Sequence, residues 1–135
     1  MKIGFDLHGV LDKYPTKFKA IIKLLGKTDI TFVVISGPPR EKVEEELTRL
    51  GFEWSDFFDI YSVVDYLYND GVEFDETDPD NLWCDDNIWW DAKARICQQY
   101  DIDYLIDDSL KYEPAFKLTE SKFIHVSEIV GKCKE

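Results

Sequence analysis

The chain has 135 residues, of which 44% are hydrophobic, so it is long enough for one domain with an apolar core. Its formal charge of −12, from 28 acidic and 16 basic residues, disfavours binding to nucleic acid or to anionic membranes. No stretch approaches the roughly 20 apolar residues of a membrane helix, and the N-terminus has no apolar segment of signal-peptide length. We therefore expect a single cytoplasmic domain over residues 1–135 that does not bind membranes.

Strand-like and helix-like segments alternate along the chain, which favours a parallel sheet with helices on its faces. The first half is expected to contain a strand at 2–6, a helix at 15–25, a strand at 30–35 and a helix at about 40–50. The second half is expected to contain a strand at 60–67, an acidic loop at 69–87, a helix at 88–100, strands at 104–106 and 123–126, and a short C-terminal helix. The pattern predicts an α/β fold, a three-layer α/β/α domain with a mainly parallel central sheet.

Polar residues stand where three of these strands end, namely Asp6, Ser36 and the pair Asp107-Asp108. The carboxyl ends of parallel strands lie on one edge of a sheet, so residues far apart in the chain can meet there. Carboxylates gathered in this way repel one another, and Mg²⁺ prefers such oxygen ligands. Lys93, on the helix before the acidic pair, could point its ammonium group at the same edge.

Four segments together resemble the four motifs of the haloacid dehalogenase-like (HAD) superfamily, in their order and in their placement at strand ends. They are Asp6-Leu7-His8-Gly9-Val10-Leu11, Ser36-Gly37, Lys93 and Asp107-Asp108. The resemblance spans nearly the whole chain and implies a Rossmann-like HAD core. It also implies transfer of phosphoryl groups through an aspartyl-phosphate intermediate, with Mg²⁺ as the cofactor.

The resemblance assigns a role to each of these residues. Asp6 would be the nucleophile, and Lys93 would neutralise charge on Asp6 and on the transferred group. Ser36 and the backbone N–H of Gly37 would bind the phosphate. The metal ligands would be the Asp6 and Asp107 carboxylates, the main-chain carbonyl of His8 and, through water or at longer range, Asp108.

His8 departs from the pattern of the family phosphatases, which usually have a second aspartate two residues after the nucleophile. That aspartate protonates the leaving group and later activates water. The metal contact of His8 is a backbone carbonyl and does not depend on the side chain. An imidazole titrates near neutrality and could supply the acid and base chemistry. Asp12 lies past the turn and is expected to be too far along the chain to take this role.

Each of these residues also has an ordinary structural interpretation. Strand-end aspartates cap turns, a Ser-Gly-Pro segment is common in loops, and a helix lysine is usually solvated. His125 is expected to be structural, and the pair Asp85-Asp86 precedes no strand end. The cysteines Cys84, Cys97 and Cys133 show no metal-binding spacing, and we expect reduced thiols.

The short intervals between the motifs leave no room for a full cap domain. The site should therefore be open, or covered by the loop at 69–87 or by a neighbouring subunit of a homo-oligomer. We expect a small capless HAD-like phosphatase that hydrolyses a phosphate monoester of unspecified identity through phospho-Asp6, with His8 as the acid/base group. The alternatives are a catalytically impaired HAD-like binding protein and a regulator that forms phospho-Asp6 but turns over slowly.

Overall fold

The computed structural model describes residues 1–131 and contains a five-stranded sheet in which all strands run parallel. The strands are β1 (Lys2–Phe5), β2 (Thr31–Ser36), β3 (Asp59–Ser62), β4 (Tyr104–Asp107) and β5 (Lys122–His125). Their order across the sheet is β3-β2-β1-β4-β5. The chain thus adds β2 and β3 on one side of β1 and then β4 and β5 on the other side. In sheets of this kind ligands bind outside the carboxyl ends of the strands at the point of reversal, here β1 and β4.

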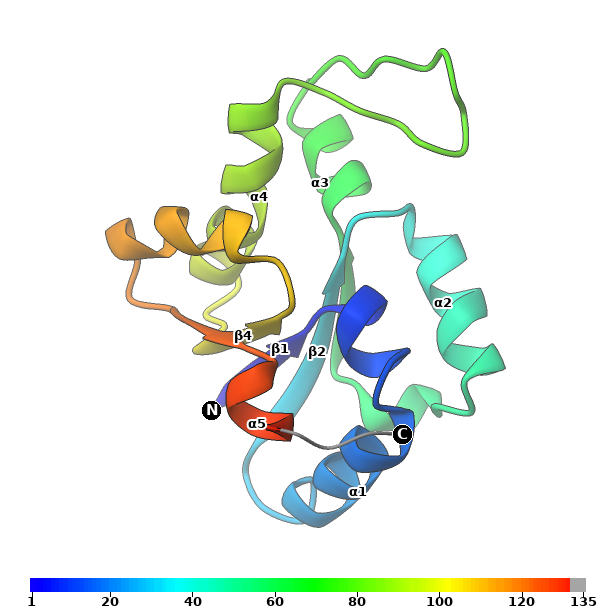
Figure 1. Ribbon diagram of the computed structural model, residues 1–135, viewed down its shortest axis with the longest axis vertical. Coiled ribbons are helices and arrows are strands. Elements are labelled where there is room, and N and C mark those ends of the chain that lie inside the picture. Colours follow the sequence, from blue (N-terminus) through cyan, green and yellow to red (C-terminus); the bar gives the residue numbers. More distant parts are fainter. Residues whose placement is uncertain (132–135) are drawn as a thin grey trace.

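Helices connect the strands and cover both faces of the sheet, which gives the three-layer, Rossmann-like α/β fold predicted from the sequence (Figure 1). The α-helices are α1 (Pro15–Leu25), α2 (Arg40–Arg49), α3 (Val63–Asn69), α4 (Asp86–Gln99) and α5 (Ser127–Val130). Three further helical segments are η1 (Leu7–Leu11), η2 (Trp54–Asp56) and η3 (Leu110–Leu118).

The side chains of β2 show how the two faces are filled. Phe32 and Val34 point into a core cluster shared with α1, α2 and α5, whereas Val33 and Ile35 point into a second cluster shared with α3, α4 and η3. Successive residues of a strand point to opposite faces, so a run that is apolar throughout suits a strand buried on both sides. This explains why the continuous apolar pattern at 30–35 correctly predicted a central strand.

The expected third strand at 60–67 is wrong in its second half. Strand β3 ends at Ser62, and helix α3 begins at Val63. The Ser62 hydroxyl accepts a hydrogen bond from the Asp65 N–H at 3.1 Å and so caps the first turn of the helix. Val63, Val64 and Leu67 then fall on one buried helical face. The β-branched residues favoured a strand, but the cap and the helical spacing decide the local structure.

The loop between α3 and α4, residues 70–85, contains little regular structure. Figure 1 shows it (green) arching away from the sheet. An antiparallel bridge between Asp75 and Trp83 closes its base, with the Asp75 N–H donating to the Trp83 carbonyl at 2.6 Å. At its tip the backbone N–H groups donate to near neighbours, such as the Asn81 N–H to the Asp78 carbonyl at 3.0 Å.

Two of the three cysteines lie within the described residues. Cys84 and Cys97 are buried free thiols, and Cys133 lies outside the described residues. Burial raises the pKa of the Cys97 thiol to about 12. Within residues 1–131, no helix has both the length and the apolar character needed to cross a membrane.

We expect amide hydrogens at 76–81 to exchange much faster than those of β2, because the backbone N–H groups of this exposed segment that form hydrogen bonds donate only to near neighbours. The Asp75 amide should be intermediate, since it is fixed by the bridge. Residue-resolved hydrogen exchange followed by NMR measures this directly. Equal protection at 76–81 and in β2 would contradict the expectation.

Candidate active site

Asp6 follows β1 directly and continues its pairing with β4, since its N–H donates to the Ile106 carbonyl at 2.9 Å. The residue is only 7% exposed. Its Oδ1 atom accepts a hydrogen bond from the Leu7 N–H at 2.8 Å. This backbone donor fixes the carboxylate at the carboxyl edge of the sheet, as the sequence predicted.

The turn after Asp6, segment η1, is oriented by its apolar residues. Leu7, Val10 and Leu11 are fully buried, so His8 and Gly9 are left toward the surface. Gly9 adopts φ 85°, a left-handed conformation that other residues adopt only at a cost. An alanine Cβ at this position would also lie 2.1 Å from Asp108 Oδ2. The glycine therefore allows the turn and the Asp108 carboxylate to pack directly against each other.

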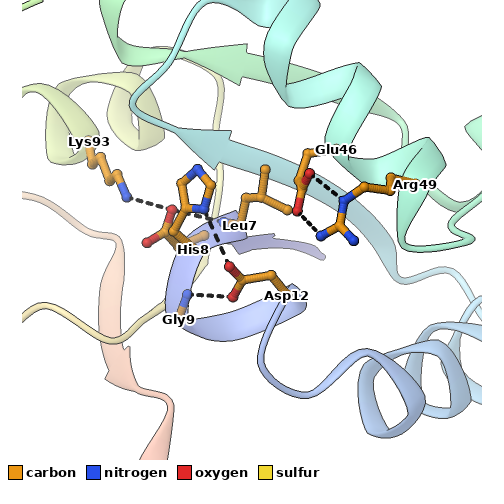
Figure 2. A network of polar contacts seen from close by, with 8 residues as sticks. Leu7, His8, Gly9, Asp12, Glu46, Arg49 and Lys93 are labelled. Carbon is orange, nitrogen blue, oxygen red and sulfur yellow. Dashed lines mark hydrogen bonds and ion pairs between the residues drawn. The ribbon is translucent and has the colours of Figure 1, made fainter. Parts of the chain in front are cut away.

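Asp12 returns to this turn, although it follows His8 by four residues and was not expected to act as the acid/base group. Figure 2 shows its two carboxylate oxygens engaging His8 and Gly9. The Gly9 N–H donates to Oδ1 at 2.7 Å, and Oδ2 lies 3.4 Å from His8 Nδ1. The His8 side chain is 59% exposed. Asp12 is thus placed to orient the imidazole, and the four-residue spacing from His8 was the available sequence signal.

Lys93 on α4 joins the carboxylates of two strands. Its Nζ atom lies 2.7 Å from Asp107 Oδ2 and 3.2 Å from Asp6 Oδ1, and the residue is 1% exposed. The ammonium group also sits 4.3 Å from the ring centroid of Tyr112. Burial lowers the pKa of Lys93, but the attraction of the two carboxylates outweighs burial, so the pKa is raised and the lysine stays charged.

Three carboxylates converge beside this lysine. Asp6, Asp107 and Asp108 each offer an oxygen, and these oxygens lie within 4.8 Å of one another. Burial raises the pKa of Asp6 to about 8. The attraction of Lys93 lowers this pKa, and the repulsion of Asp107 raises it further. Burial and then the charge of Asp107 also raise the pKa of Asp108. One ammonium group does not balance three carboxylates, so the cluster has excess negative charge when all three are ionised.

The carboxylate cluster has the size and chemistry to hold a magnesium ion. Oxygens on opposite sides of Mg²⁺ are separated by about twice the metal–oxygen distance of about 2.1 Å, close to the spread of this cluster. All three potential ligands are hard oxygen donors, and a divalent cation would relieve their mutual repulsion.

Ser36, the last residue of β2, ends at the same edge. It is fully buried, and its Oγ atom has no hydrogen-bond partner among residues 1–131. A buried hydroxyl without a partner is costly, which is why such groups usually have one. The adjacent Gly37 has little room for a side chain, because a Cβ there would lie 3.1 Å from Trp89 Cζ2. The two residues therefore offer a hydroxyl and an unobstructed stretch of backbone at the site.

These groups border one cavity of about 370 Å³ at the carboxyl ends of β1, β2 and β4. Its lining includes the sequence-predicted residues Asp6, His8, Ser36, Gly37, Lys93 and Asp108, together with Trp89, Trp90 and Tyr112. Asp107 lies beneath, fully buried, with Oδ1 accepting the Ser109 N–H at 3.0 Å. Tyr112 was not predicted, because η3 carries it and no sequence pattern marked that segment.

The other candidates have structural roles. His125 Nε2 contacts the Asp108 carbonyl at 3.0 Å, and Nδ1 contacts the Ser127 hydroxyl at 2.7 Å, so His125 helps to hold the backbone behind the acidic pair. Asp85 caps α4 by accepting from the Asn87 N–H, and Asp86 accepts from the Trp83 indole at 2.8 Å.

Comparison with known proteins informs the fold alone. No family model matches the chain, and no curated protein matches it. The structure is similar to the crystal structure of an uncharacterized protein from Corynebacterium glutamicum, with a TM-score of 0.53 and 19% sequence identity. The similarity covers 96% of this chain and 92% of that chain, so the three-layer arrangement is shared over nearly the full length of both.

We expect Gly9→Ala to destabilise the fold more than Gly71→Ala does. Gly71 has nearly the same conformation, with φ 83°, but no atom lies within 4 Å of an added Cβ. Both variants incur the left-handed penalty of about 1–2 kcal/mol, and only Gly9→Ala must also displace Asp108. Urea unfolding of the two variants and wild type measures the difference. Equal losses would show that the Asp108 carboxylate moves aside without cost.

Proposed function

We propose that the protein is an HAD-like, Mg²⁺-dependent phosphatase that hydrolyses a phosphate monoester through phospho-Asp6. The observation that carries this proposal is the convergence of Asp6, Asp107 and Asp108 around buried Lys93 at the carboxyl edge of the sheet. Phosphoryl transfer depends mainly on positioning and on neutralising charge, and this edge gathers groups for both tasks. The partnerless Ser36 hydroxyl gives further support, since a phosphate oxygen would satisfy it.

In the first step the Asp6 carboxylate attacks phosphorus, so that an O–P bond to the protein forms while the ester P–O bond breaks. Within residues 1–131, the hydrogen bond from Leu7 and the ion pair with Lys93 both involve Oδ1. Oδ2 is therefore the oxygen we assign to the attack. Protonated His8 gives its proton to the departing ester oxygen, which leaves as an alcohol.

In the second step water attacks the phosphorus of phospho-Asp6. Neutral His8 takes a proton from this water, the bond between Asp6 and phosphorus breaks, and inorganic phosphate leaves. Asp6 and protonated His8 are thereby restored. Asp12 keeps the imidazole directed toward the turn in both steps, as a positioning residue.

The other groups bind the phosphoryl group and balance its charge. Ser36 Oγ and the Gly37 N–H donate to the phosphate oxygens, and Lys93 offsets negative charge on Asp6 as it develops. Asp6, Asp107, Asp108 and the His8 carbonyl would hold Mg²⁺, which when bound supplies positive charge to the transferring phosphoryl group.

A second candidate is a binding protein that has lost efficient hydrolysis. The exposed imidazole of His8 favours it, because a side chain that is 59% exposed is less firmly positioned than the buried groups around it. Such a protein would bind Mg²⁺ and phosphate at the same edge without turning over esters. Measurements of metal binding and of turnover separate the two candidates.

We expect Mg²⁺ to raise the midpoint of thermal unfolding of the wild-type protein, because the ion binds the carboxylate cluster of the folded state only. A Mg²⁺ concentration of 100 times Kd stabilises a one-site protein by about 2.7 kcal/mol. Calorimetric melting with MgCl₂, and with NaCl at equal ionic strength, measures the effect. Asp107→Asn should lose most of the rise, whereas Asp29→Asn, at an exposed position, should keep it. A rise that NaCl reproduces would contradict a specific site.

We expect Asp6→Asn to abolish phosphatase activity and His8→Ala to lower kcat by about 10²–10⁴-fold, the usual contribution of general acid/base catalysis. His8→Ala keeps the backbone carbonyl, so Mg²⁺-dependent melting should remain. Rates for a panel of sugar, nucleotide and aryl phosphates, measured between pH 5 and pH 9 (about the range in which imidazoles titrate), test both variants.

The pattern of results separates the candidates. If wild type and Asp6→Asn are equally inactive with every ester, the results favour the binding protein. If wild type hydrolyses an ester and His8→Ala does so at the same rate at every pH, Asp6 remains the nucleophile but His8 is not the acid/base group.

A further inference from the structure

We propose that the organic group of the substrate is a flat, uncharged aromatic group, bound in a second cavity that adjoins the carboxylate site. This inference rests on the proposed function, because it names the part of the ester that leaves. The cavity measures about 380 Å³, within the range of small-molecule sites. It lies between α2, the turn η1 and the loop at 70–85.

The second cavity adjoins the carboxylate cavity. Four residues line both of them: His8, Gly37, Pro38 and Trp89. An ester whose phosphate sits at Ser36 and Gly37 can therefore extend its organic group past Trp89 into the second cavity. His8 lies at the junction, where the oxygen between phosphate and organic group would be. This oxygen must receive a proton when the ester bond breaks, and His8 lies where that proton donor is required.

Aromatic and aliphatic side chains form most of the walls. The rings of Trp83 and Trp89 lie 5.0 Å apart between centroids, inclined by 33°. The other apolar lining residues are Leu7, Pro38, Pro39, Val43, Val64, Pro79 and Leu82. Trp83 remains 39% exposed although it is large and apolar. An aromatic ligand would cover this ring and gain stacking energy from it.

Trp83 is held in a defined position. The Asp75–Trp83 bridge fixes its backbone, and its indole N–H donates to Asp86 Oδ1 at 2.8 Å. The ring also packs edge-on against Trp90, with centroids 5.8 Å apart. Trp83 therefore presents a fixed flat surface to the cavity, as a binding wall requires.

The charges around the cavity favour an uncharged group. Among the described lining residues Lys42 is the one lysine or arginine, and Asp80 pairs with it at 3.4 Å. Glu46 is paired with Arg49. His8, at the junction of the two cavities, faces Asp12, so a second phosphate or a carboxylate on the substrate would find no unpaired lysine or arginine in the described lining. The geometry selects against sugar bisphosphates and for a neutral ring.

The test compares two esters of aliphatic alcohols, 2-naphthylmethyl phosphate and glycerol 1-phosphate, so that the leaving groups are chemically similar. We expect wild type to prefer the naphthylmethyl ester in kcat/KM. Trp83→Ala should lower kcat/KM for that ester by about 3- to 10-fold, the factor expected from loss of one aromatic contact, and lower kcat/KM for glycerol 1-phosphate by a smaller factor. Trp83→Phe should restore most of the preference. Trp54→Ala, which removes an exposed tryptophan elsewhere, is the matched control.

A binding measurement separates failure of this inference from failure of the phosphatase proposal. Titration calorimetry with 2-naphthylmethylphosphonate, which cannot be hydrolysed by this route, is performed on wild type and Trp83→Ala in Mg²⁺. If no ester is hydrolysed but the phosphonate binds and Trp83→Ala weakens it 3- to 10-fold, the aromatic site stands and the phosphatase does not. If the esters are hydrolysed without preference and phosphonate binding is independent of Trp83, the aromatic site is overturned. If no ester is hydrolysed and the phosphonate does not bind, both proposals are overturned.

Discussion

The buried contact of Lys93 with Asp6 and Asp107 is the interaction on which the site depends. It ties α4 to the ends of β1 and β4, the two strands at the reversal point of the sheet. Removing three charges from water is costly, and the cost is offset only when they pair closely and their other bonds are satisfied. Backbone N–H groups of Leu7 and Ser109 supply those bonds. The same contact that orders the sheet edge thus keeps a carboxylate and a cation together in a place with little water.

The placement of the principal site residues could be predicted because parallel strands bring their carboxyl ends to one edge. A polar residue after an apolar run, as at Asp6, Ser36 and Asp107, is then sufficient to locate a group in space. Lys93 could be added because a helix preceding β4 must pack near that edge. Short apolar runs also located the central strands, but the same kind of run misled at Val63 and Val64, where β-branched residues belong to a helix that Ser62 caps.

The features that the sequence did not reveal depend on side-chain contacts within loops and turns. Asp12 reaches His8 only because the turn closes with Gly9 in a left-handed conformation. Trp83 lines a cavity only because its loop is closed by the bridge to Asp75. Neither contact follows from a repeating pattern, since each is set by the path of one irregular segment. The fold and the position of the carboxylate cluster were accordingly more predictable than the loop and turn contacts around them.

The packing of Asp108 against Gly9 has an evolutionary consequence. The two positions lie on different strand ends, yet a side chain at position 9 would occupy the space of the carboxylate. Change at either position is therefore constrained by the other. Among related chains, a residue larger than glycine at position 9 should occur together with a shorter side chain at position 108. Covariation between these sites would record a steric constraint between positions that are far apart in the sequence but in contact in the fold.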